Sequence, residues 1–206
     1  MTETVRVWDP LLRLFHWALV ISFAVAWLSS EESQGLHELA GYVVAGLLAF
    51  RLVWGLVGGR YARFSQFLRG PVTTLAYLRD MVTGREKRHI GHNPAGAAMI
   101  VALVLSLSAT AYTGWLMADQ TRIALVPQIV TMAHADEDGE YGEYREYGES
   151  GGGSAGDLHE VFANLTLLLV ALHVGGVVLA SIRHKENLAR AMVTGRKRAA
   201  EPGDIA

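Results

Sequence analysis

The feature that most constrains this chain is an apolar run near its C-terminus, from Val161 to Ile182, which holds no charged residue. A helix needs about 20 apolar residues to cross a bilayer, so a spanning helix is expected here. His159 and His173 lie on this helix, 14 residues apart. That spacing corresponds to about 21 Å along the axis and falls about 40° short of four full turns. Both imidazoles therefore project from one face, at two depths.

An ionisable or ligating side chain inside a membrane is costly, and it is a functional hypothesis by default. Two such side chains on one stripe favour two stacked cofactors, each of which takes a second ligand from another helix. A structural interpretation is open at this point. In it, His159 caps the helix at the water interface and His173 hydrogen-bonds a neighbouring helix.

The composition agrees with a membrane protein, since 51% of the 206 residues are hydrophobic, 18% are charged and the mean hydropathy is +0.24. Hydropathy predicts one all-α domain over residues 1–206, an integral membrane four-helix bundle. The expected helices are 10–29, 36–57, 94–117 and 157–182. The first run is not read as a signal peptide, because His16 and Trp17 interrupt its front.

The distribution of charge predicts the orientation. Sixteen of the 18 Lys and Arg residues fall in the N-terminal arm, the connection 58–93 with its margins, or the C-terminal tail. Cytoplasmic segments carry such an excess, so both termini and loop 58–93 are expected in the cytoplasm, and loop 119–156 outside. This predicts a multi-pass protein of the bacterial inner membrane.

The chain has no cysteine. Disulfides, cysteine-ligated iron–sulfur clusters and the covalent attachment of a c-type haem are thereby excluded. Any haem must be held by axial ligands and non-covalent contacts.

Four histidines fall at two depths. His16 lies roughly 7–8 Å inside the first helix from the cytoplasmic edge, close to the depth expected for His173. His37 and His159 each sit in a Leu-His-Glu triplet that opens a helix from the external side. Two bis-histidine sites result, His16 with His173 and His37 with His159.

Such ligation closes both axial positions of a haem iron and favours electron transfer. Zinc is the competing interpretation, but it usually takes four ligands in a tetrahedron.

Arg51 follows His37 by 14 residues, as His173 follows His159. It is therefore expected at the level of the cytoplasmic-side histidines, where its planar fork suits a haem propionate. The alternative is that Arg51 extends to cytoplasmic headgroups.

Residues 5–198 resemble the bacterial cytochrome b561 family, which includes the b-type subunits of nickel–iron hydrogenases. The resemblance rests on the His159/His173 pair and on four further motifs: Arg13-Leu14-Phe15-His16-Trp17, Leu36-His37-Glu38, Gly91-His92-Asn93-Pro94-Ala95-Gly96 and Thr113-Gly114-Trp115. It implies two non-covalent haem b groups held between four helices by His16, His37, His159 and His173.

Members of this family differ in their redox partner. The expected function is electron transfer across the inner membrane between the quinone pool and a periplasmic partner, such as a c-type cytochrome. The alternatives are a superoxide:quinone oxidoreductase and the membrane-anchor cytochrome b of a hydrogenase or dehydrogenase. A redox-silent membrane scaffold or transporter is a third class. No nucleic-acid partner is expected.

The expected external loop is acidic. Ten acids and two arginines lie between Asp119 and Glu160, with the acids densest at 136–150. The loop either docks a basic periplasmic protein or only keeps itself solvated.

The other histidines are not expected to be ligands. His92 precedes Pro94 at the membrane edge, where it would bond a loop or propionate, or pass protons to a quinone. His89, His134 and His184 are expected to be exposed.

Overall fold

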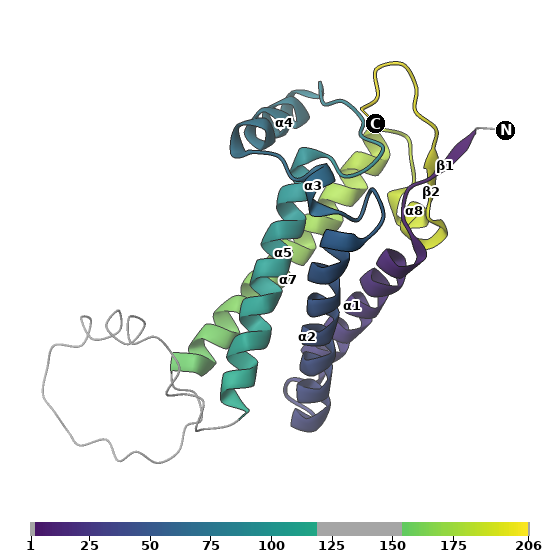
Figure 1. The fold of residues 1–206 in the computed structure, drawn as a ribbon. Coiled ribbons are helices and arrows are strands. Elements are labelled where there is room, and N and C mark those ends of the chain that lie inside the picture. The colour runs from purple at the N-terminus through teal and green to yellow at the C-terminus, as the bar shows by residue number, and fades with distance from the viewer. Residues whose placement is uncertain (1–2, 119–153, 206) are drawn as a thin grey trace, which may run out of the picture.

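The structure, a computed structural model, describes residues 3–118 and 154–205. Its long helices are α1 (Pro10–Ser29), α2 (Gln34–Val57), α5 (Pro94–Met117) and α7 (Ser154–Arg183). Each is long and apolar enough to cross a membrane, so the predicted helical membrane bundle is confirmed (Figure 1). Helices α1 and α5 have the expected bounds, whereas α2 begins earlier and α7 extends further at both ends. The acidic stretch 136–150 lies outside the described residues.

Local sequence explains where two of these helices begin. The Asp9 carboxylate accepts a hydrogen bond from the Leu12 amide at 2.9 Å, and the Asn93 side chain accepts one from Gly96 at 2.7 Å. Each cap is followed by a proline, whose fixed φ suits the first helical position. Both starts lie at the same end of the bundle (Figure 1).

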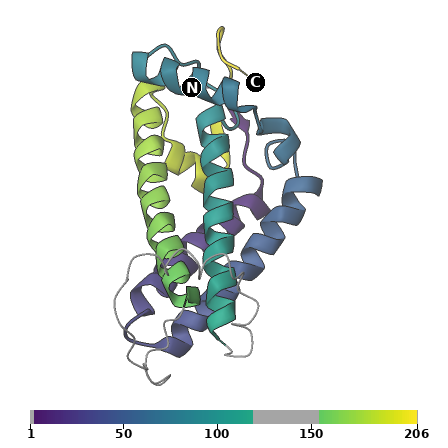
Figure 2. The ribbon, with the colours of Figure 1, turned by 90° about the vertical axis from the view of Figure 1, so that its left-hand side faces the viewer.

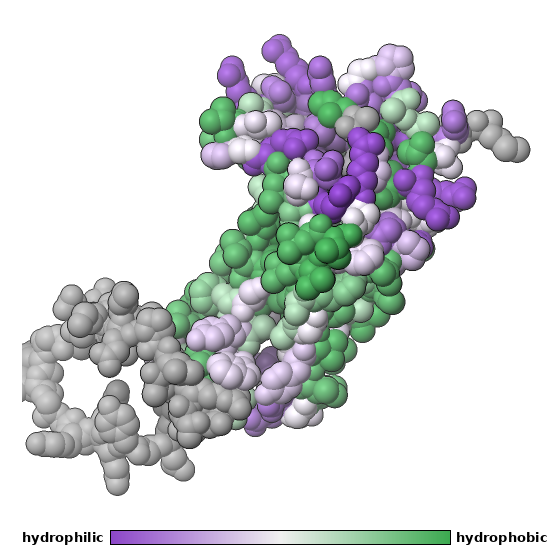
Figure 3. All heavy atoms as spheres, in the orientation of Figure 1, coloured by the Kyte–Doolittle hydropathy of each residue, from purple (hydrophilic) through white to green (hydrophobic). Residues whose placement is uncertain are grey.

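The four helices pack as two pairs. Helix α1 lies along α2, α5 lies along α7, and α2 also contacts α5 (Figures 1 and 2). Val44, Leu48 and Leu107 form a small buried cluster where α2 meets α5. Most apolar surface of the spanning helices stays exposed, and only 6% of the most apolar part of α7 is buried. Figure 3 shows this apolar surface between polar ends, as a bilayer requires.

One end of the bundle carries a cap of short elements. It contains α3 (Phe64–Phe67), α4 (Pro71–Thr83), α8 (Leu188–Thr194) and an antiparallel pair of strands, β1 (Thr4–Arg6) and β2 (Arg196–Arg198). The strands pair Val5 with Lys197, so the two ends of the chain meet (Figure 1). This sheet was not predicted from the sequence, because its strands are short and carry charged residues. The cap packs on a buried cluster that includes Trp8, Phe15 and Ile90.

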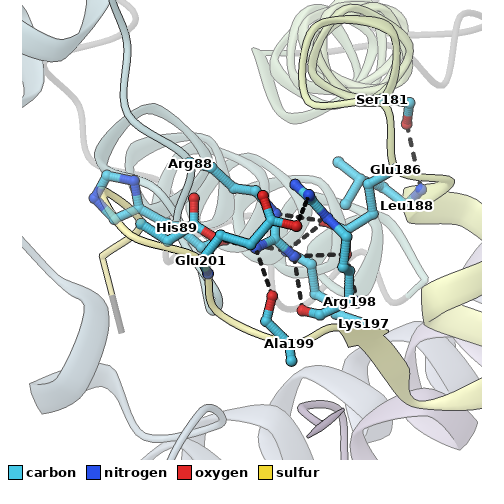
Figure 4. Close-up of polar contacts among 10 residues, drawn as sticks. Arg88, His89, Ser181, Glu186, Leu188, Lys197, Arg198, Ala199 and Glu201 are labelled. Atoms are coloured by element: carbon cyan, nitrogen blue, oxygen red, sulfur yellow. Dashed lines mark hydrogen bonds and ion pairs between the residues drawn. The ribbon is translucent and has the colours of Figure 1, made fainter. Parts of the chain in front are cut away.

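A buried ion network fastens the C-terminal tail to this cap (Figure 4). The Arg88 guanidinium pairs with the Glu186 carboxylate at 2.8 Å and also with Asp204. The Lys197 ammonium lies 3.4 Å from Glu186 and donates to the His89 carbonyl. Arg88 and Lys197 are each only 5% exposed, so these charges are paired away from solvent.

Candidate functional site

The histidines expected nearest the external side face each other. His37 comes from the first turn of α2 and His159 from the second turn of α7. Their ring centroids lie 6.0 Å apart, with an angle of 78° between the ring planes. These two imidazoles, from helices far apart in sequence, can approach one group from opposite sides.

Hydrogen bonds to backbone carbonyls fix the tautomer of both rings. His37 Nδ1 lies 2.8 Å from the Ala26 carbonyl, and His159 Nδ1 lies 3.0 Å from the Thr110 carbonyl. A carbonyl oxygen only accepts, so each Nδ1 carries the proton and each Nε2 keeps its lone pair. Metal-ligating histidines are oriented in this way by the bond from their other nitrogen.

Helix α5 supplies the surroundings of His159. The Thr113 hydroxyl lies 3.2 Å from His159 Nδ1 and gives it a second acceptor. A Cβ at Gly114 would lie only 3.0 Å from His159 Cε1, so the missing side chain permits this close approach. In the sequence, Thr113-Gly114-Trp115 contributed to the family resemblance, but nothing in it indicated that Thr113 and Gly114 would lie beside His159.

At the capped end, His16 on α1 and His173 on α7 form a looser pair. The two side chains lie within electrostatic range of each other, but their rings are not in contact. The ring of His16 meets Trp17 edge-on at 5.2 Å, and its Nδ1 is buried without a hydrogen-bond partner in the described chain. The structure thus brings His37 and His159 together more closely than His16 and His173.

Arg51 lies inside the bundle, not at the headgroups. Arg51 is only 3% exposed, and its guanidinium carbon lies 4.4 Å from the centre of the Phe64 ring. Phe64 approaches so closely because Gly55 has no side chain; a Cβ there would lie 2.0 Å from the ring. The snorkelling alternative is therefore wrong. Arg51 Nη1 is buried and has no hydrogen-bond partner among the described residues.

The remaining histidines differ partly from expectation. His92 is half-buried, with its ring between Trp8 and Phe67 at centroid distances of 4.6 and 4.5 Å. His89 and His184 are half-buried too, so their expected exposure was wrong. His89 Nδ1 bonds the Lys87 carbonyl at 3.1 Å, inside its own loop. His134 lies outside the described residues.

The donor set suits haem better than zinc. Within residues 3–118 and 154–205, no group of three or more His, Cys, Asp or Glu side chains gathers to hold a metal ion. The paired imidazoles instead present two nitrogen donors from facing helices, which is the axial set of a b-type haem. Arg51 Nη1 is unpartnered, so the guanidinium has a free donor of the kind that suits a carboxylate. The residues present therefore fit haem.

Comparison with known families agrees with this geometry. A family model described as prokaryotic cytochrome b561 matches residues 7–195. No curated protein and no solved structure matches the chain. The family match covers nearly all of the sequence and all four spanning helices. The chain therefore belongs to the prokaryotic cytochrome b561 family, and it is a multi-pass b-type cytochrome of the bacterial inner membrane that binds haem b and transfers electrons.

Proposed function

We propose that this protein is a di-haem cytochrome that carries electrons across the inner membrane between the quinone pool and a periplasmic redox partner. The observation that carries the proposal is the pair His37–His159, with rings 6.0 Å apart and both Nδ1 atoms bonded to backbone carbonyls. His16 and His173 form the second site, about 21 Å away along α7. Two such sites cover much of the roughly 30 Å hydrocarbon layer.

Residues of this chain would bind the haem at each of the two sites. Haem b supplies reversible one-electron chemistry at iron when it is bound. Two histidine ligands at each haem would leave the iron no open position for oxygen, which would favour electron transfer over oxygen activation. We assign Arg51 to a propionate of the cytoplasmic-side haem, because its guanidinium is buried beside Phe64 with Nη1 unpartnered.

The ligand assignment is tested by single alanine substitutions. We expect His37→Ala and His159→Ala to lose the same haem, and His16→Ala and His173→Ala to lose the other. His89→Ala is the matched control, because the His89 side chain is half-buried but hydrogen-bonds the Lys87 carbonyl in its own loop. Haem per polypeptide and the visible spectrum are measured. The assignment is wrong if two or more of the four variants keep both haems with unchanged spectra.

The partner on the periplasmic side is proposed from charge. The ten acids between Asp119 and Glu160 adjoin His159 and would steer a basic c-type cytochrome toward the outer site. The same charge repels superoxide, which disfavours a superoxide:quinone oxidoreductase.

The test measures electron transfer to a basic cytochrome and compares the protein with residues 136–150 intact and the protein in which their charges are neutralised. Screening acts over about 8 Å at physiological ionic strength, so the intact protein should lose rate steeply with salt. Equal rates and equal salt dependence would leave the acids as a solvating segment.

A further inference from the structure

Two unpartnered nitrogen atoms belong to side chains that lie beside the same aromatic ring, Phe67, near the cap. Arg51 Nη1 and His92 Nδ1 are both buried and have no hydrogen-bond partner among the described residues. The Phe67 ring links them, since its centre lies 6.0 Å from the Arg51 guanidinium carbon and 4.5 Å from the His92 ring. Arg51 is also near enough to His92 for its positive charge to act on the imidazole.

Burying a guanidinium without a partner costs free energy. The loss of hydration is offset only when the buried charge forms ion pairs and hydrogen bonds. Asp9 is the carboxylate whose charge acts on Arg51, but it forms no ion pair with it. Its oxygens instead accept from the Leu12 amide and from Trp54 Nε1 at 3.3 Å. The guanidinium N–H groups of Arg51 therefore lack an oxygen acceptor. A carboxylate suits them best, because its two oxygens fit the planar arrangement of these donors.

The surroundings of His92 make it a fixed, neutral donor. Its ring is held between Trp8 and Phe67, and the next residue, Asn93, caps helix α5. Burial, followed by the positive charge of Arg51, lowers the pKa of His92 to about 3. A neutral imidazole carries one N–H and can donate one hydrogen bond to an oxygen.

We propose that Arg51 and His92 together form a carboxylate-binding site, walled by Trp8, Phe64 and Phe67, and that its ligand is a propionate of the haem at the His16–His173 level. This assigns a binding role to His92 and rests on the proposed di-haem function. Arg51 supplies the charge and fork, and His92 supplies a directed hydrogen bond.

The position of the site favours a propionate over a carboxylate from the cytoplasm. Arg51 is only 3% exposed, so little of it is open to a solute. It follows His37 by the same 14 residues that separate His173 from His159, which places it at the level of the inner pair. A carboxylate attached to a group already inside the bundle meets these conditions.

The test compares two forms of the cofactor in three proteins. Wild type, His92→Phe and the control His89→Phe are loaded with iron protoporphyrin IX or with its dimethyl ester, which has no free carboxylate. Phenylalanine keeps a ring between Trp8 and Phe67 but removes the N–H. Binding affinity and the midpoint potential of each haem are recorded, with Arg51→Lys as a second variant that keeps charge but loses the fork.

With the free acid, we expect His92→Phe to keep both haems but to bind one of them roughly tenfold more weakly, as for loss of a hydrogen bond to a charged group. That haem should also have a lower potential, because the less compensated carboxylate favours the oxidised iron. Arg51→Lys should weaken the same haem. With the diester, His92→Phe and wild type should be equal, and His89→Phe should match wild type with either form.

Three results overturn the inference. The first is that His92→Phe and Arg51→Lys both match wild type with the free acid, and the second is that their defect is equally large with the diester. The second result identifies a free cytoplasmic anion as the ligand, which added acetate would reveal by changing the potential. Wild type holding fewer than two haems contradicts the proposed function itself, and is distinguished because it appears before any substitution.

Discussion

The imidazole of His159 shows how single residues set the chemistry of the outer site. Its Nδ1 has two acceptors on α5, the Thr110 carbonyl at 3.0 Å and the Thr113 hydroxyl at 3.2 Å. The Thr113 hydroxyl also bonds the Ala109 carbonyl at 2.9 Å, so it faces His159 with its lone pairs. This arrangement increases electron density on the ring and holds its orientation.

Replacing Thr113 with valine keeps the shape and removes the second acceptor. A ligand with a weaker bond at Nδ1 donates less to the iron, so the potential of the outer haem should rise. A change of about 1 kcal/mol corresponds to roughly 40 mV for one electron. Thr113→Ser should restore the wild-type value. A redox titration measures both haems, and an unchanged outer haem in Thr113→Val would remove Thr113 from this role.

The four proposed ligands could be predicted from the sequence because helical spacing converts directly into depth and face. Their supporting atoms could not. The partners of His37 and His159 are the backbone carbonyls of Ala26 and Thr110, and any residue type carries a carbonyl. The burial of Arg51 could not be predicted from the sequence either. It depends on the packing of Phe64, from the segment after α2, against Gly55.

Among the elements, the cap joins segments from both ends of the chain. Glu186 follows α7 and accepts from Arg88 at 2.8 Å and from the Arg198 amide at 2.9 Å. Burial alone raises the pKa of the Glu186 carboxyl, but the bond from Arg88 and the charge of Lys197 outweigh it and lower the pKa. The ionised carboxylate therefore stabilises the docked tail.

Glu186→Gln should release the tail locally. Breaking a buried pair costs roughly 3 kcal/mol, which corresponds to about 100-fold faster amide exchange in β2 (Arg196–Arg198). Glu201→Gln is the control, because Glu201 pairs with Arg198 at the surface, where its side chain is 58% exposed. Such pairs contribute about 0–1 kcal/mol. Hydrogen exchange by mass spectrometry measures both, and equal protection in the two variants would contradict a stabilising network.

The pH dependence of this tail follows from the same carboxylate. A group with a lowered folded pKa stabilises above its unfolded pKa, and this contribution is lost as pH falls through the folded value. The difference in exchange between wild type and Glu186→Gln should therefore be full at neutral pH. It should close as pH falls below the ordinary range of glutamate, about 4.3. A difference that stays constant down to acid pH would contradict this linkage.

The helices themselves followed from hydropathy and from the caps at Asp9 and Asn93, since both signals are local. The cap was harder to predict. Strands β1 and β2 bring residues 4–6 beside residues 196–198, and no local pattern encodes a pairing across the whole chain. The order of packing, with α2 against α5, depends on small clusters such as Val44 and Leu107.

For the whole molecule, orientation decides which side of the membrane each pair of histidines faces. Sixteen of the 18 basic residues lie in segments expected on the cytoplasmic side. The chain has no cysteine, so single cysteines can be introduced and labelled without a background. Ser33 and Lys87 are both exposed and lie in different connections.

In spheroplasts, a membrane-impermeant maleimide should label Ser33→Cys at once, and Lys87→Cys only after the membrane is permeabilised. The physical reason is that the basic connection is expected in the cytoplasm, which would place the turn between α1 and α2 on the external side. Haem content confirms that each variant is folded. The reverse labelling pattern would place both termini outside and exchange the two haem sites.

A potentiometric titration of the purified wild-type protein tests whether one chain holds two haem b groups at two depths. The two sites should have different surroundings, since Thr113 and Gly114 lie beside His159, whereas the spacing from His37 predicts the cationic Arg51 at the level of His16 and His173. Their potentials should therefore differ. We predict two b-type haems per polypeptide by chemical assay and two resolved one-electron transitions in the visible spectrum, both reducible by quinol. One haem per chain, or a protein that quinol cannot reduce, would contradict this account.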